Sequence, residues 1–156
     1  MAEAAQAGGI AIPAAVKHMV DHALVERHPM LVSYVDVDDR PVLTFRGSTQ
    51  VFADDKLAIW VRHADGAFIR AIGRNPNVAL MYRNEDTKAT YQFRGRAAVS
   101  AADADRRRVF DSAPEAERNH DPERRGAALV ITLDSLQGYA GLGPGGPIDP
   151  VKMTRG

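Results

Sequence analysis

Strand-like segments joined by short turns run through most of this sequence and constrain its fold more than any other feature. Segments 30–37, 42–53 and 56–62 are rich in Val, Ile, Tyr and Phe, and parts of them alternate apolar and polar residues, as β-strands do. Turn residues at 38–41 and 54–55 separate these segments. Because strands joined by such short turns pair as antiparallel hairpins, the sequence predicts a mainly antiparallel sheet.

The remaining segments add three strands and three helices to this pattern. Further strands are expected over three apolar or alternating segments, 78–82, 90–99 and 127–133. Helices are expected where apolar residues recur at three-and-four spacing or follow helix-start signals, at 12–27, 66–74 and 101–112. Six strands with three flanking helices predict a small α+β barrel.

The length of 156 residues fits a single domain. We expect that domain to span residues 12–140. The Ala/Gly-rich residues 1–11 lack the basic and apolar parts of a signal peptide, so we expect a disordered leader. The Gly/Pro-rich residues 141–156 are expected to form an extended tail.

Composition excludes several kinds of function. The chain has no cysteine, so disulfides, thiolate nucleophiles and Cys-based metal sites are excluded, which fits a cytoplasmic location. Lys plus Arg and Asp plus Glu both total 20, whereas a protein that binds nucleic acid usually carries a basic excess. No apolar run approaches the roughly 20 residues of a membrane helix. His18 and His22 lack a third ligand, so no metal site is expected.

Five consecutive polar or glycine residues, Arg46, Gly47, Ser48, Thr49 and Gln50, interrupt the second predicted strand. A glycine inside a strand indicates a bulge or a close approach of a ligand to the backbone. Arg46 can offer a planar fork to a phosphate, and Ser48 can offer a hydroxyl donor. The alternative is a solvated strand face with a bulge.

Two further places carry polar groups that suit a ligand. Trp60 is either a core residue or a residue that packs beside an aromatic ligand. In the second case, Arg62 is available to bind an anion. The helix predicted to begin at Gly66 can offer its free N–H groups to a phosphate. The alternative is that this place is a plain strand-to-helix loop without a ligand. Gln92 can bond the edge of a heterocycle, or it belongs to a polar sheet face.

From Val16 to Tyr139, the sequence resembles the pyridoxamine 5'-phosphate oxidase-like family of FMN-binding split barrels. The resemblance rests on short motifs in a fixed order: RPV at 40–42, RGS at 46–48, LAIWVR at 57–62, NPNVAL at 75–80 and FRGRA at 93–97. It implies a mainly antiparallel, six-stranded split β-barrel with flanking helices. It also implies a homodimer with FMN at the subunit interface.

The resemblance also implies which residues hold the cofactor. The family's first flavin-binding strand falls on residues 45–50, and its next strand ends in two ring-flanking residues that fall on Trp60 and Val61. The basic pair that the family oxidase places at the following helix start is missing from residues 65–68. The candidate cofactor-binding residues, which include the arginines able to replace that pair, are Arg46, Gly47, Ser48, Thr49, Gln50, Trp60, Val61, Arg62, Gly66, Phe68, Arg70 and Gln92.

The function that the resemblance implies is a flavin-dependent oxidoreductase acting on a small molecule, with no catalytic side chain identified. Two alternatives stay open: a flavin-binding protein without turnover, and a relative that binds a deazaflavin or heme in the same cleft. The Trp- and Arg-containing C-terminal segment of the true oxidase has no match in residues 138–156. The chain is therefore expected to be a relative of the vitamin B6 enzyme and not that enzyme.

Overall fold

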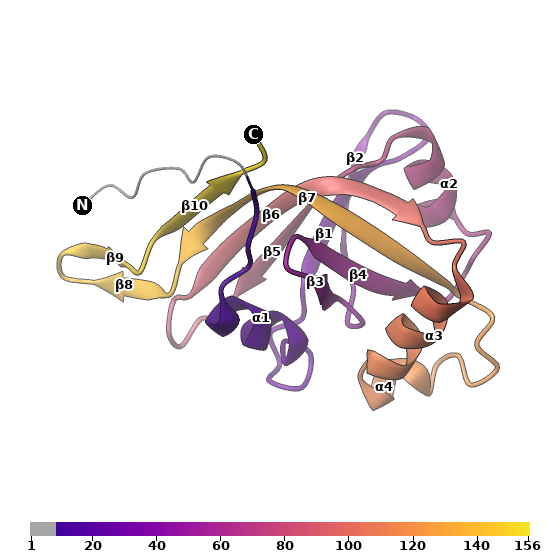
Figure 1. Cartoon of the computed structure of the whole chain (residues 1–156), viewed down its shortest axis with the longest axis horizontal. Helices are drawn as coiled ribbons and strands as arrows, with labels where there is room; N and C mark the ends of the chain where they lie inside the picture. Colours follow the sequence, from indigo (N-terminus) through magenta and orange to yellow (C-terminus); the bar gives the residue numbers. More distant parts are fainter. Residues whose placement is uncertain (1–8) are drawn as a thin grey trace.

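A computed structural model describes residues 9–156, and this part of the chain forms an antiparallel sheet flanked by four helices (Figure 1). The strands are β1 (Leu31–Val35), β2 (Pro41–Phe45), β3 (Gln50–Ala53), β4 (Lys56–Val61), β5 (Asn77–Arg83), β6 (Thr90–Val99), β7 (Ala127–Tyr139), β8 (Gly141–Gly143), β9 (Gly146–Ile148) and β10 (Val151–Thr154). The helices are α1 (Ala14–Asp21), α2 (Ala67–Arg74), α3 (Asp103–Ser112) and α4 (Glu115–Arg118). The α+β, mainly antiparallel architecture is confirmed; the expected number of six strands is wrong.

The main sheet is open at one seam, between β2 and β3. Its strand order is β2-β1-β5-β6-β7-β4-β3, with β10 also paired to β7. In a flat sheet the two edge strands would lie about 29 Å apart, at about 4.8 Å per strand spacing. The turn 46–49 that joins them can span only about 17 Å, so the sheet must curl. No pairing joins β2 to β3 within residues 9–156, so the curled sheet remains a split barrel.

β7 holds the two halves of the sheet together. It pairs with β6 on one side, and with β4 and then β10 on the other. The pairings of β1 with β2 and of β5 with β1 and β6 build one half, and β3 with β4 builds the other. Within the described chain, β7 is therefore the strand that joins these two halves.

The apolar run of β4 serves two cores because its side chains alternate. Leu57, Ile59 and Val61 face the main core inside the barrel, where α1 and α2 also bury side chains. Ala58 and Trp60 face the opposite way, into a smaller cluster formed with α3 and β7. From Leu57 to Val61, β4 is therefore buried on both faces, which explains why no polar residue follows Lys56 in this strand.

Asp121 anchors the segment between α4 and β7 beneath Trp60. Its Oδ2 accepts hydrogen bonds from Trp60 Nε1 and the Gly126 N–H, both at 2.9 Å, and its Oδ1 accepts one from the Arg125 N–H at 3.0 Å. Arg106 lies over the Trp60 ring and donates to the Gly126 carbonyl. Asp121 is buried, so these bonds satisfy a carboxylate removed from water.

The helix and strand expected in the first third of the chain are shorter than predicted. α1 ends at Asp21, and turns follow it to Arg27, which has a φ of 66°. The strand expected over 42–53 divides into β2 and β3. The polar cluster therefore begins in a turn rather than inside a strand.

The two ends of the described chain are more structured than expected. Ile10 and Ile12 are buried in the main core, so residues 9–11 are not a disordered leader; residues 1–8 lie outside the described part. The expected extended tail forms a β8–β9 hairpin and the strand β10, and Figure 1 shows the hairpin projecting at the end of the sheet away from α3 and α4. None of the helices in residues 9–156 is both long and apolar enough to span a membrane.

Candidate functional site

The turn 46–49 is tied to β4 by the hydroxyl of Ser48. Ser48 Oγ accepts a hydrogen bond from the Trp60 N–H at 3.0 Å and donates one to the Trp60 carbonyl at 2.9 Å. Thr49 Oγ1 donates to the Arg46 carbonyl at 2.7 Å. Both residues are buried, so their hydroxyls already stabilise the seam from within the chain.

Gln50 links the same turn to α3. Its Nε2 donates to the Val109 carbonyl at 2.9 Å and to the Ser48 carbonyl at 3.3 Å, and the side chain is buried. Hydrogen bonds within the chain thus explain why residues 48–50 are polar. Contacts of these three side chains with a flavin stay a prediction, and their donors would have to leave their present partners to make them.

Trp60 and Val61 both face protein. The Trp60 indole bonds Asp121 and packs edge-on against Phe110, with ring centroids 5.0 Å apart, whereas Val61 points into the main core. These contacts agree with the interpretation of Trp60 as a core residue. A ring-flanking role for either residue stays a prediction.

Arg46 differs from its neighbours because its half-buried side chain has one buried, unsatisfied donor. Its Nε is buried and has no hydrogen-bond partner in the described chain, although buried donors are nearly always paired. The guanidinium carbon lies 4.3 Å from the centroid of the Phe68 ring. Tyr34 stacks on Phe68 with the ring centroids 4.6 Å apart. The guanidinium therefore lies over a pair of stacked aromatic rings.

The electrostatics of this place favour an anion. Burial lowers the pKa of Arg46; nearby Tyr34 and Glu117 oppose this effect, whereas the positive charge of Arg62 adds to it. Arg62 is exposed. No ion pair within residues 9–156 includes Arg46 or Arg62. We call Arg46, Arg62, Phe68 and Tyr34 the seam cluster.

The residues at the N-terminus of α2 make contacts within the chain itself. Gly66 precedes the helix, and a Cβ placed on it would lie 2.9 Å from His63 Cβ, so the tight turn requires glycine. Arg70 Nη1 donates to the Asp65 carbonyl at 2.5 Å. This arginine is thus directed back onto the loop before the helix, which leaves Arg46 and Arg62 as the better-placed cations.

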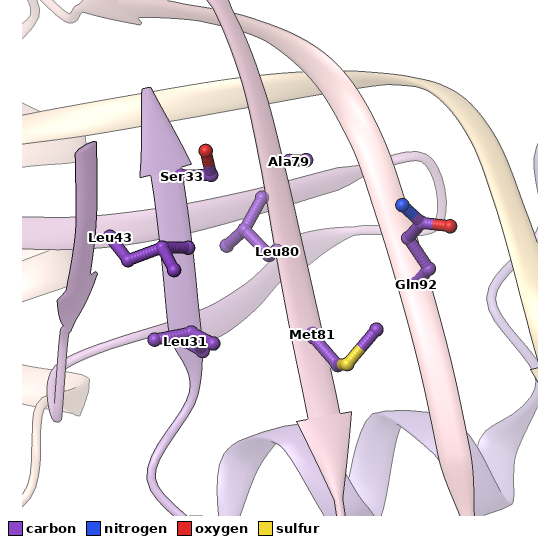
Figure 2. Close-up of a pocket in the computed structure, with 7 residues that line it drawn as sticks. All are labelled: Leu31, Ser33, Leu43, Ala79, Leu80, Met81 and Gln92. Carbon is purple, nitrogen blue, oxygen red and sulfur yellow. The ribbon is translucent and has the colours of Figure 1, made fainter. Parts of the chain in front are cut away.

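Gln92 lies apart from the seam cluster, on the outside of the sheet. Its Oε1 accepts a hydrogen bond from Gln137 Nε2 at 3.2 Å. It lines a shallow pocket (Figure 2) formed with residues of β1, β2 and β5: Leu31, Ser33, Leu43, Ala79, Leu80 and Met81. The structure therefore does not bring all twelve predicted residues together.

The pocket belongs to an apolar surface that the sequence predictions missed. The outer apolar face, as we call it, comprises Leu31, Leu43, Phe45, Ala79 and Met81, which the strand register places side by side. Leu43 and Phe45 are 68% and 66% exposed. Phe45, at the edge of this face, directly precedes Arg46 in the chain, so this face reaches the start of the turn 46–49. The signal was in the sequence, since β2 is apolar at the outward positions.

Comparisons with known proteins identify the fold. No protein-family model matches the chain, and no curated protein matches it significantly. Among solved structures, general stress protein 26 from Bacillus anthracis is similar with a TM-score of 0.63 at 17% identity, over 89% of this chain and 98% of that one. HupZ from Group A Streptococcus is similar with a TM-score of 0.62 at 16% identity, over 84% and 95%.

A third solved structure carries the name that the sequence motifs suggested. It is a pyridoxamine 5'-phosphate oxidase-related, FMN-binding protein from Nostoc punctiforme, with a TM-score of 0.63 at 14% identity over 81% of each chain. A Clostridium acetobutylicum protein of the pyridoxinephosphate oxidase family is also similar, with a TM-score of 0.61 at 11% identity, over 88% of this chain and 95% of that one. The chain therefore has the fold of the pyridoxamine 5'-phosphate oxidase-related proteins.

Proposed function

We propose that this chain binds FMN as a homodimer and acts as a flavin-dependent oxidoreductase on a small molecule. The observation that carries the proposal is that, within residues 9–156, the buried Nε of Arg46 has no partner and the neighbouring Arg62 forms no ion pair. The likeness to an FMN-binding protein of the same fold supports it. A cytoplasmic location stays a prediction.

The seam cluster fits the anionic end of FMN. A phosphate or an electron-rich ring oxygen is best held by planar guanidinium donors, and Arg46 and Arg62 supply two of them at one place. They substitute for the basic pair that is absent from residues 65–68. Bound FMN would supply hydride or electron transfer through its ring. In this proposal the chain's own side chains bind and orient the cofactor.

The outer apolar face supports the proposed homodimer. Large exposed apolar patches usually mark interaction sites, and a two-fold axis can bring the same patch of two copies together. Since this face reaches the start of the turn 46–49 through Phe45, a partner docked there would border the cofactor. This arrangement agrees with a flavin held at the subunit interface.

The bound chromophore is the most direct test of the proposal. The purified protein is expected to show flavin absorbance, and heat release followed by mass spectrometry is expected to identify FMN. A Soret band would point instead to heme, and a released mass matching a deazaflavin would point to that cofactor. A colourless protein that takes up no added FMN would overturn the proposal. Steady NAD(P)H-driven turnover separates an oxidoreductase from a flavin-binding protein without turnover.

Arg46→Ala is expected to weaken FMN binding by about 1–3 kcal/mol, or about 5- to 150-fold, because it removes charged hydrogen-bond donors from the ligand. Fluorescence titration of FMN into both apoproteins measures the change. Arg40→Ala, at an exposed position in the β1–β2 turn, is the matched control and should leave binding unchanged. Equal FMN affinity in the Arg46 variant and the wild type would remove Arg46 from the site.

A further inference from the structure

A carboxylate from α4 lies directly on the turn that carries Arg46. A Cβ placed on Gly47 would be 2.5 Å from Glu117 Oε1 and 3.0 Å from Leu24 Cδ2. Glu117 is half-buried. α4 is held in place by Arg118, whose Nη1 donates to the Ala113 carbonyl at 2.5 Å. Glycine at position 47 thus leaves the space that the Glu117 carboxylate occupies.

Glu117 is close enough to Arg46 to act on its charge without forming an ion pair. Its negative charge raises the pKa of Arg46, opposing burial, which is the largest effect, and the charge of Arg62, which lowers it. No ion pair among the described residues includes Glu117. The seam therefore holds two positive charges and one negative charge, none neutralised by direct contact.

We propose that Glu117 is an internal counter-ion that limits the affinity of the seam cluster for anionic ligands. The inference rests on the proposed function, because it assumes that the ligand's anion meets Arg46. A carboxylate on the adjacent turn repels a bound phosphate and attracts the guanidinium that should hold it. Glu117 is thus a positioning residue that acts through Arg46, and it discriminates between ligands by their charge.

Two different substitutions disturb the same carboxylate. Glu117→Gln keeps the shape of the side chain and removes its charge. Gly47→Ala keeps the charge and pushes it away, because the contact at 2.5 Å is with the mobile end of a side chain. Glu115→Gln, at an exposed position on the same helix, removes a charge that is not among those acting on Arg46 and is the matched control.

The decisive measurement compares FMN with riboflavin, which has the same ring and no phosphate. Glu117→Gln is expected to raise FMN affinity by about 3- to 10-fold, by loss of like-charge repulsion, and to leave riboflavin affinity unchanged. Gly47→Ala is expected to change FMN affinity in the same direction, and Glu115→Gln to change neither. An unchanged FMN affinity in Glu117→Gln, or an equal rise for both ligands, would overturn the counter-ion role.

Inorganic phosphate separates this inference from the proposed function. If the wild type binds neither FMN nor riboflavin, the proposed function fails, and phosphate is then titrated at constant ionic strength while thermal unfolding is followed. A larger phosphate-induced rise of Tm in Glu117→Gln than in the wild type still supports the counter-ion role. Equal rises, or no rise in either protein, overturn that role as well.

Discussion

Leu43→Asp is expected to convert the proposed homodimer into a folded monomer. Leu43 is 68% exposed on the outer apolar face of the single chain, so a charge there costs the monomer little. In the dimer the same position becomes buried, and an unpaired buried charge costs several kcal/mol. The two-fold axis places this charge in both copies. The dissociation constant of the dimer should therefore rise by about 100-fold or more.

Sedimentation equilibrium measures the dimer directly, and circular dichroism checks that the variant is folded. The matched control is Val99→Asp. Val99 is 45% exposed at the end of β6 and pairs with the core residue Leu129. Because paired residues share a face of the sheet, Val99 lies on the face opposite to that of Leu43. The control should remain dimeric. A Leu43→Asp protein that dimerises as tightly as the wild type would exclude the outer apolar face from the interface.

Asp121→Ala is expected to lower the free energy of unfolding by about 3–5 kcal/mol. The substitution leaves the Trp60 indole and the N–H groups of Arg125 and Gly126 without their acceptor, and each unsatisfied buried donor costs about 1–3 kcal/mol. Urea unfolding monitored by Trp60 fluorescence and by circular dichroism measures the loss. Glu123→Ala, exposed in the same segment, should change stability by less than about 0.5 kcal/mol. A similar small effect in Asp121→Ala would contradict the anchoring role.

The Asp121 carboxylate should also make the free energy of unfolding depend on pH in the acid range. Burial alone would raise the pKa of Asp121, but hydrogen bonds from Arg125, Gly126 and Trp60, with the charge of Arg106, outweigh it and lower the pKa. A carboxylate with a lowered pKa in the folded state stabilises that state above its unfolded pKa of about 3.9. The contribution is lost as the pH falls through the folded pKa. The stability difference between wild type and Asp121→Asn should therefore shrink in acid, as measured by urea unfolding at several pH values.

Local sequence signals located the elements of this fold best where a strand or helix pattern runs unbroken between turn residues. β6 has the predicted bounds, and α2 begins one residue later than expected. Strand β10 was missed although its partner β7 is near in sequence, because it lies in a Gly/Pro-rich segment that carries no clear local strand pattern. The division at 46–49 was missed because residues of high strand propensity flank it on both sides.

The candidate site was predictable as a place but not as a set of contacts. Residues 46–50 stood out because polar side chains gathered where apolar ones were expected, and the structure does bury Ser48, Thr49 and Gln50. A sequence does not reveal what satisfies a buried polar group, and here the chain itself satisfies these three. Glu117 could not be foreseen either, because tertiary packing alone brings α4 onto Gly47.

The position of β7 in the chain has a consequence for synthesis on the ribosome. The strands from β1 to β6 emerge first. β4 and β6 do not pair with each other, so nothing connects them in the sheet until β7, residues 127–139, lies between them. Contacts between residues distant in sequence slow folding, and unpaired strand edges favour aggregation during that interval. The barrel therefore cannot form until about the last fifth of the chain has emerged, and this interval is the one in which chaperone protection matters most.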